Sequence, residues 1–369
     1  MLSGLRNILS DNKHRLLQSI YKLQLANKRI EVPTDDIALS YGSAIGSELE
    51  QRVSLTGGKV KLAHLHSRYR HSETKFNILY LVSSALPPYS VELAKWAREI
   101  GVKVVLNQNG VAYPAWTTNY DHINAELSAL IKASNLVIYQ TNYCKDTADR
   151  FIGLADGEWD ICTNCVDIDT FFPIACKKTD VIRLLIAGTH FQRERVTLSL
   201  AALRFLLDRG FSATLMVAGQ LAWDGADDDI KQLINQLQLA DTVFLKGSYT
   251  QLEAPTIFSE ADILLHFKYK DPCPNVVIEA LASGLPVLGS ASGGLPELVG
   301  ENAGVLLEVP DQWDHMCYPA VDQIEQGLGL IVSRLSDFQG AARRHAVTKF
   351  GHEDWLRFHE DWFRELVFS

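Results

Sequence analysis

Two carboxylates stand eight residues apart around a sequence that is suited to start a helix. Asp271 and Glu279 flank Pro274, and proline fits the first turn of a helix, where its missing N–H would have no partner. Glu279 then lies five residues into the helix, about 7.5 Å along its axis. Helix starts attract anions, so the spacing suits a diphosphate at the helix end and a hydroxyl-rich ring beside the glutamate.

A Gly-Gly turn follows the next expected strand. One strand, 262–267, precedes Asp271, and another, 286–290, precedes Gly293 and Gly294. Ligands of open parallel sheets bind at the carboxyl ends of the strands. We therefore expect the helix start and the Gly-Gly turn to face the same crevice.

Short apolar runs alternate with helical patterns along the chain, which predicts parallel strands joined by crossover helices. The strands lack polar alternation, which predicts sheets buried on both faces. The expected strands are 36–41, 76–83, 102–107, 136–140, 158–163, 182–188, 212–218, 242–246, 262–267, 286–290 and 304–308. The expected helices are 57–70, 89–100, 121–133, 142–152, 194–208, 227–239, 250–260, 274–283, 338–349 and 352–367.

These elements divide into two runs, so the expected fold class is α/β with two Rossmann-like domains. The two runs meet around 164–180, where 177–180 form a polar stretch, and the linker is expected there. The predicted boundaries are a helical segment at 1–35, a first domain at 36–173, a second domain at 174–350 and a C-terminal helix at 351–369. The last helix has no strand to cross to, so it covers an edge or reaches back to the first domain.

Charge and cysteine content exclude several classes of protein. The 369 residues hold 35 Lys and Arg against 44 Asp and Glu, a net charge of −9, and no long basic block offsets this charge, which argues against nucleic acid as a partner. No apolar stretch of about 18 residues lacks breakers, and no signal peptide is recognisable. Six cysteines fit a reducing cytoplasm. Cys162, Cys165 and nearby Cys176 lack the fourth ligand of a zinc site, so we interpret them as free thiols.

The N-terminal residues 1–29 carry six Lys or Arg against one acid, Asp11, with a partial apolar stripe. Two interpretations stay open. The segment is a helix packed on its own domain, or it is a basic amphipathic helix that docks on an anionic membrane. The expected location is the cytoplasm, with the inner face of the membrane as the alternative for this segment.

The motif set resembles glycosyltransferase family 4, whose members have the GT-B fold. Asp271 and Glu279 form D-x7-E, which continues as EALASGLPV and then GGLPE. TNCVDIDTFFP at 163–173 resembles the family's inter-domain segment, LLIAG at 184–188 the strand that opens the donor domain, and LTGGKVKLAHL at 55–65 the Gly-Gly loop of the acceptor domain. The resemblance implies an acceptor-side domain at 36–173 and a nucleotide-sugar donor domain at 174–350, with sheets facing across a cleft.

The resemblance also implies residue roles. Glu279 would hold the ribose hydroxyls of a nucleotide, and Asp271 would contact the transferred sugar. The backbone of Cys273, Pro274, Asn275 and Val276 would meet the diphosphate. Further donor-binding positions would be Gly188, Gly293, Gly294, Gly57 and Gly58.

Three departures from the family pattern fall near the reactive centre. Asp271 stands where glutamate is usual and is one methylene shorter. Thr189 occupies the place of a usual arginine, so Arg193 and Arg195 are expected to supply the cations that offset leaving-group charge. Asn109 ends a strand where histidine is frequent, and it can hydrogen-bond a sugar hydroxyl but cannot act as a general base. For His190 and His266 we expect structural roles.

The predicted activity is transfer of a sugar from a nucleotide-sugar donor to a hydroxyl acceptor, with retention of anomeric configuration. The acceptor is a glycan, a lipid-linked compound or a small molecule, and no metal or cofactor is expected. Asp167 and Asp169 form a D-x-D, which we interpret as a turn, and Asp227 to Asp229 as a helix start. The alternative is a non-catalytic scaffold that binds nucleotide or glycan.

Overall fold

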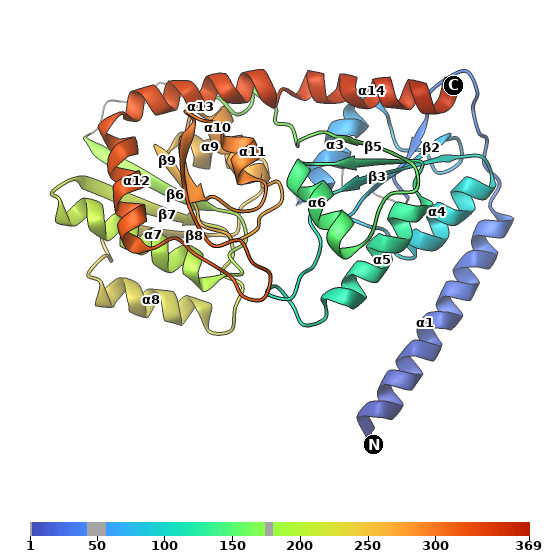
Figure 1. Ribbon diagram of the computed structural model, residues 1–369, viewed down its shortest axis with the longest axis horizontal. Helices are drawn as coiled ribbons and strands as arrows, with labels where there is room; N and C mark the ends of the chain where they lie inside the picture. The colour runs from blue at the N-terminus through green and yellow to red at the C-terminus, as the bar shows by residue number, and fades with distance from the viewer. Residues whose placement is uncertain (1, 43–56, 174–179) are drawn as a thin grey trace.

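The computed structural model describes residues 2–42, 57–173 and 180–369, and gives no account of the side chains of residues 2–12, 14 and 15. Two parallel sheets, each with its own helices, lie side by side (Figure 1). The first has the order β1-β2-β3-β4-β5. Its strands are β1 (Leu39–Ser40), β2 (Ile78–Val82), β3 (Lys103–Gln108), β4 (Leu136–Tyr139) and β5 (Glu158–Ile161), and its helices are α3 (Gly58–Arg68), α4 (Ser90–Glu99), α5 (Tyr120–Ala133) and α6 (Asn142–Phe151).

The second sheet has the order β11-β10-β9-β6-β7-β8. The chain starts at β6 in the middle and later returns to β9 on its other side, so a topological switch point lies between β6 and β9. Its strands are β6 (Val181–Ala187), β7 (Ser212–Ala218), β8 (Val243–Gly247), β9 (Ile263–His266), β10 (Val287–Ser290) and β11 (Gly304–Leu307). Its helices are α7 (Arg193–Asp208), α8 (Ala226–Gln236), α9 (Ala254–Ser259), α10 (Asn275–Ala282), α11 (Leu295–Val299), α12 (Val321–Ser333) and α13 (Leu335–Lys349).

The eleven expected strands are all present in the described part of the chain, within a few residues of their expected bounds. Every residue of β2, β4 and β9 is buried, as the missing polar alternation predicts. In the edge strands, two of the four residues of β5 and four of the five residues of β8 are exposed, so burial on both faces is wrong for them. The sequence analysis also missed α11 and α12. The first is a single short turn, and the second lies in a stretch for which no element was expected.

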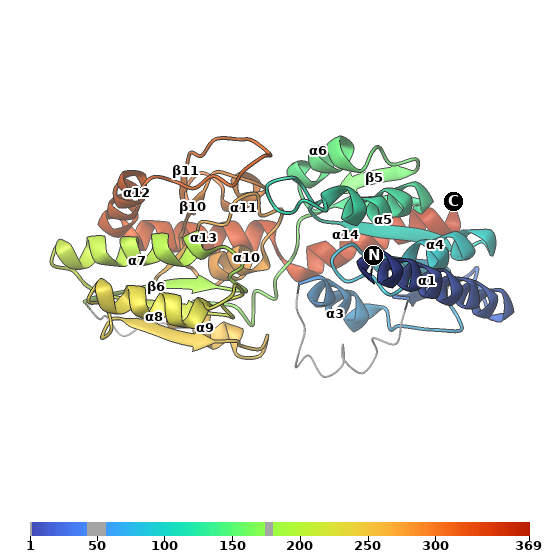
Figure 2. The ribbon, with the colours of Figure 1, turned by 90° about the horizontal axis from the view of Figure 1, so that it is seen from below.

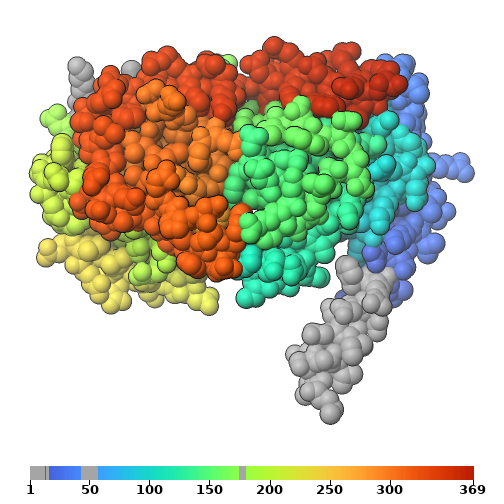
Figure 3. All heavy atoms as spheres, in the orientation of Figure 1, coloured from blue at the N-terminus to red at the C-terminus, as the bar shows by residue number. Residues whose placement is uncertain are grey.

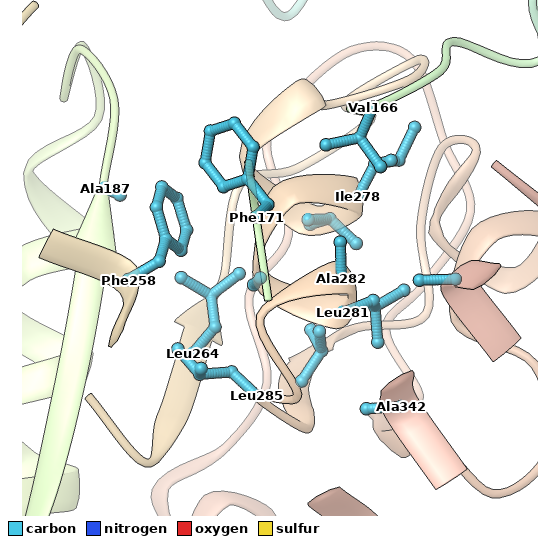
Figure 4. Close-up of a cluster of buried hydrophobic side chains, with 14 of the residues drawn as sticks. Val166, Phe171, Ala187, Phe258, Leu264, Ile278, Leu281, Ala282, Leu285 and Ala342 are labelled. Atoms are coloured by element: carbon cyan, nitrogen blue, oxygen red, sulfur yellow. The ribbon is translucent and has the colours of Figure 1, made fainter. Parts of the chain in front are cut away.

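The inter-domain segment is anchored in the core of the second domain. Val166 and Phe171 lie among the side chains of α10 (Figure 4). The guanidinium of Arg343 on α13 donates to the carbonyl oxygens of Ile168 and Phe171 and to that of Ala282, at distances of 2.7–3.0 Å. One arginine therefore ties the segment to the C-terminal end of α10. Residues 174–179 of the expected linker lie outside the described residues.

The last helix returns to the first domain. Helices α13 and α14 (His352–Phe368) run along one edge of the molecule and cover both domains (Figure 3). Trp355, Leu356 and Phe363 of α14 are buried against the first sheet, and Tyr80 Oη lies 2.9 Å from His359 Nε2. The chain thus crosses between the domains twice.

Helix α1 (Leu2–Asn27) projects from the first domain and lies beside α4 (Figures 1 and 2). Its contact with the body comes from its last turns, where Leu25 is buried and the ring of Tyr21 lies 5.2 Å from that of Tyr89. No helix in the described ranges is both long enough and apolar enough to cross a bilayer.

Candidate functional site

The loops at the carboxyl ends of the two sheets meet around Pro272. Thr141, which follows β4, donates from Oγ1 to the carbonyl oxygen of Pro272 at 3.2 Å. A Cβ on Gly110, after β3, would lie 2.9 Å from Pro272 Cγ. The loop between β9 and α10 therefore faces the first domain directly, and any ligand of this loop is within reach of both domains.

The start of α10 presents free backbone donors. Pro274 is the N-cap residue, with an extended backbone. The N–H groups of Asn275 and Val276 have no hydrogen-bond acceptor within the described ranges. Asn164 of the inter-domain segment donates to the carbonyl oxygen of Cys273 at 2.9 Å and to Asn275 Oδ1 at 2.7 Å. The helix start is thus held in place while its N–H groups stay open to an anion.

Asp271 is buried and held by a lysine and a histidine. His266 Nε2 and Lys268 Nζ each lie 3.1 Å from its Oδ2. Burial acts to raise the pKa of the Asp271 carboxyl, but Lys268 and the hydrogen bond from His266 outweigh it and keep the pKa well below its ordinary value. Asp271 is therefore a carboxylate, and the contacts made by described residues leave its Oδ1 open to a sugar hydroxyl.

Glu279 is also buried, but in a neutral environment. Gln251 Nε2 donates to its Oε1 at 2.9 Å. Burial raises the pKa of Glu279 to about 7, and the hydrogen bond from Gln251 opposes the shift. No cation of the described residues lies near this carboxyl group, which suits a partner that brings hydroxyl donors, such as a ribose.

The glycines of the expected donor site let neighbouring backbone segments pack closely together. Gly293 has φ +68°, and a Cβ there would lie 2.3 Å from the carbonyl oxygen of Asp271. A Cβ on Gly294 would lie 1.9 Å from the carbonyl oxygen of Pro272. Gly188, at the end of β6, would place a Cβ 3.5 Å from Val276 Cγ1. The Gly-Gly turn thus packs closely against the backbone of the Asp271 loop, a role that was not expected from the sequence.

The first domain contributes its own loops. Gly58 opens α3, and a Cβ there would lie 2.6 Å from Ser84 Oγ. Gly57 precedes it with an exposed backbone and φ +48°. Asn109 is tied to the neighbouring loop by two hydrogen bonds. Its Oδ1 accepts from Ser83 Oγ at 3.0 Å, and its backbone N–H donates to Ser83 Oγ at 3.0 Å. Its side-chain amide group remains as a donor beside the site.

The two expected arginines do not come together at α10. Arg193 is exposed and forms a two-pronged ion pair with Asp229 at 2.6 and 2.8 Å. Arg195 is 3% exposed, and its terminal nitrogens donate to the carbonyl oxygens of Thr189 and Ala187 at 2.9 and 3.1 Å. Arg195 is buried in the second domain within electrostatic reach of Asp271. Arg193 lies at the surface, where it pairs with Asp229.

Two of the weaker patterns behave as expected. Asp167 Oδ1 accepts from the N–H groups of Asp169 and Thr170, so the D-x-D is a turn. Cys162 and Cys165 are free thiols, while Cys176 lies outside the described residues. Within the described ranges, no three His, Cys, Asp or Glu side chains are grouped so as to hold a metal ion.

Sequence reasoning missed several residues that build the site. Glu297 of the GGLPE motif reaches across to α6, where it accepts from the N–H groups of Asn142 and Tyr143, each at 2.8 Å. His266 was expected to be structural, and its partner Asp271 was not anticipated. Asn164 lies in a quoted motif, but its partners depend on the tertiary fold.

Residues 167–317 match the model of the family Glycosyl transferases group 1. This range includes Asp271, Glu279 and the Gly-Gly turn. The family match lies within the second domain, and the two parallel-sheet domains have the GT-B fold, as the motif set predicted. Assignment to family 4 in particular stays a prediction.

Known proteins resemble this chain in part of the sequence or in the fold. N-acetyl-alpha-D-glucosaminyl L-malate synthase of Bacillus anthracis is 32% identical over 83 residues, 22% of this chain and 21% of that protein. The chain spans about a fifth to a third of the length of the curated relatives it matches. Sucrose-phosphate synthase from Thermosynechococcus elongatus has a TM-score of 0.63 at 16% identity, covering 94% of this chain and 90% of that one. Anabaena Alr3699/HepE in complex with UDP has a TM-score of 0.62 at 14% identity, covering 89% and 85%.

Proposed function

We propose that this chain transfers a sugar from a nucleotide-sugar donor to a hydroxyl acceptor. One observation carries the proposal. The open N–H groups at the start of α10 lie between Asp271 on one side and Glu279 on the other, within the range that matches the family model. An anion-binding helix start flanked by two carboxylates with different environments suits a ligand with a sugar, a diphosphate and a nucleoside in that order.

The proposed chemistry depends on positioning and charge stabilisation. The bond between the sugar C1 and the diphosphate oxygen breaks, with its electron pair on the phosphate. The acceptor oxygen forms the new bond to C1, and its proton passes to the departing phosphate. Because the phosphate accepts the proton, no side chain has to act as a strong base, which agrees with Asn109 in place of histidine. The proposal includes retention of configuration and needs no metal.

The acceptor is proposed to be presented at a membrane by helix α1. Leu16, Leu17, Ile20 and Leu23 are 41–65% exposed, and basic residues accompany them in 1–29. The remaining 340 residues hold 29 Lys and Arg against 43 Asp and Glu, so this segment has a net positive charge on a chain that is otherwise net negative. Apolar and basic side chains on one projecting helix suit an anionic lipid surface. We therefore favour a lipid-linked acceptor and a cytoplasmic enzyme that contacts the membrane's inner face.

The transfer proposal is tested with labelled UDP-, GDP- and ADP-sugars, each offered with lipid extract, glycan or water as acceptor. The account predicts that one donor gives labelled product or free sugar, and that Asp271→Asn lowers this turnover while nucleoside diphosphate binding stays nearly unchanged. Binding of a nucleoside diphosphate without any turnover would favour the non-catalytic scaffold. Absence of both binding and turnover would refute the proposed function.

Docking of α1 is tested by sedimentation with vesicles of phosphatidylglycerol and phosphatidylcholine at low salt. The full chain is expected to sediment with the anionic vesicles, and Leu16→Ser combined with Leu23→Ser is expected to abolish this. A chain that ignores anionic vesicles but dimerises in solution would show that α1 binds a second copy, and the membrane proposal would be wrong.

A further inference from the structure

A buried lysine that has no partner among the described residues lies where the two domains meet. Lys61 is in the first turn of α3, three residues after Gly58, and is 4% exposed. Within the described ranges it forms no hydrogen bond or ion pair. An ammonium group withdrawn from water without compensation is unfavourable, and burial lowers the pKa of Lys61. The fold tolerates this cost at a position beside the expected Gly-Gly loop.

Lys61 lies near the start of α10, the start of α6 and the inter-domain segment. Its charge is within electrostatic reach of the thiols of Cys273, Cys144 and Cys165. Burial raises the pKa of both Cys273 and Cys144 to about 12, so these thiols are neutral and do not balance the lysine. Cys273 directly precedes the N-cap of α10, whose open N–H groups carry the positive end of the helix dipole.

The two helix starts near Lys61 differ in one respect. The N-terminus of α6 is neutralised by the carboxylate of Glu297, but the N-terminus of α10 has no carboxylate on its N–H groups within the described ranges. Positive potential from α10 and from Lys61 therefore adds up at one place. Such an arrangement is complete only when an anion occupies it.

The other cations of this region already have partners. Lys268 pairs with Asp271, Lys270 with Asp311, and Arg193 with Asp229. The terminal nitrogens of Arg195 donate to backbone carbonyls. The position at which the resemblance leads one to expect an arginine holds Thr189, which is exposed and uncharged.

We propose that Lys61 binds the diphosphate of the donor from the acceptor-side domain and supplies the charge that Thr189 cannot. This inference rests on the proposed function, because it takes the nucleotide-sugar diphosphate as the anion. Lys61 and the N–H groups of Asn275 and Val276 then clamp the diphosphate from opposite domains. The clamp also stabilises the charge that the diphosphate gains as the sugar leaves.

The experiment compares nucleoside diphosphate and monophosphate binding by calorimetric titration, using whichever of UDP, GDP or ADP the wild-type chain binds most tightly. Lys61→Met keeps the length and apolar stem of the side chain, and Lys95→Met, on the exposed face of α4 in the same domain, removes the same charge elsewhere. Lys61→Met is expected to weaken diphosphate binding 10- to 100-fold and monophosphate binding less. Lys95→Met is expected to change neither, and Lys61→Arg to recover part of the loss.

A second readout separates ligand binding from folding. Because the ligand-free protein buries an unpaired ammonium, Lys61→Met is expected to melt at the same temperature as the wild type or higher, with a smaller diphosphate-induced shift. Diphosphate binding of Lys61→Met at wild-type strength, while Glu279→Ala weakens it, would overturn the role of Lys61 and leave the proposed function standing. Failure of both Lys61→Met and Lys61→Gln to fold would show a structural lysine and also overturn it. If the wild-type chain binds no diphosphate and transfers no sugar, the proposed function itself fails.

Discussion

Glu279→Gln should make the ligand-free protein more stable at alkaline pH. Glu279 is buried, and its pKa is raised from 4.5 to about 7. The folded state therefore holds a proton that the unfolded state has already released between pH 4.5 and 7. Stability falls as the pH rises through this interval, by about 1.4 kcal/mol for each pH unit. Below the unfolded pKa no stability is lost, and above pH 7 the loss is complete.

The magnitude follows from the difference between the two pKa values. A rise from 4.5 to about 7 corresponds to about 3 kcal/mol of stability lost at pH 8.5. Glutamine removes the titration and can still accept the hydrogen bond from Gln251 through Oε1, so the packing of the site is retained. The difference in stability between Glu279→Gln and the wild type should thus grow by about 3 kcal/mol between pH 4.5 and 8.5.

The assay is urea unfolding followed by circular dichroism at half-unit pH steps from 4.5 to 8.5. Subtracting the two proteins at each pH cancels the titration of all other groups. A constant difference across this range would refute the burial argument for Glu279. At pH 8.5 the same variant should bind nucleoside diphosphate about 10- to 100-fold more weakly, because a charged hydrogen-bond acceptor contributes roughly 1.5–3 kcal/mol.

Three further outcomes follow from the structure. Glu297→Ala removes the carboxylate from the start of α6, so the domains should separate more easily, with a larger radius of gyration in X-ray scattering. Unchanged scattering would show that Glu297 does not hold the two domains together. Arg343→Met deletes the hydrogen bonds to three carbonyl oxygens and should lower the free energy of unfolding by about 2–3 kcal/mol, which urea titration measures; a loss below the error of the titration would mean that the inter-domain segment holds itself in place. Transfer activity should persist in excess EDTA, and its loss with rescue by Mn²⁺ would show that a metal does the work assigned to Lys61 and α10.

The strands and the order of the motifs could be predicted because their signals are local. Runs such as FNILYLVS and IRLLIAG predict buried parallel strands. Pro274, with a carboxylate on either side, indicates one helix start. The edge strands β5 and β8 were predicted as strands, but their exposure depends on which strands end up at the rim, and that follows from topology. Helix α12 was missed because it lies in a long stretch after the last strand, for which the sequence analysis expected no element.

The spacing of the two carboxylates along the candidate site could be predicted, but the positions of its cations could not. Asp271, Glu279 and the helix between them come from one continuous segment, so their spacing is readable in the sequence. Lys61 is separated from Cys273 by more than two hundred residues, and only the docking of the two domains brings them near. The family resemblance suggested Arg193 as a substitute for the arginine missing at Thr189, but Arg193 pairs with Asp229 on α8. Charge at a site assembled from two domains depends on tertiary contacts that local patterns do not encode.

Calorimetric titration of the wild-type chain and of Glu279→Ala with UDP, GDP and ADP tests whether the start of α10 is a nucleotide-sugar site. The account predicts that at least one of the three binds the wild type with a single site, and that Glu279→Ala weakens this binding about 10- to 100-fold, the loss of a charged hydrogen-bond acceptor. If none of the three nucleotides binds the folded wild-type chain, or if Glu279→Ala binds as tightly as the wild type, the start of α10 is not a nucleotide-sugar site.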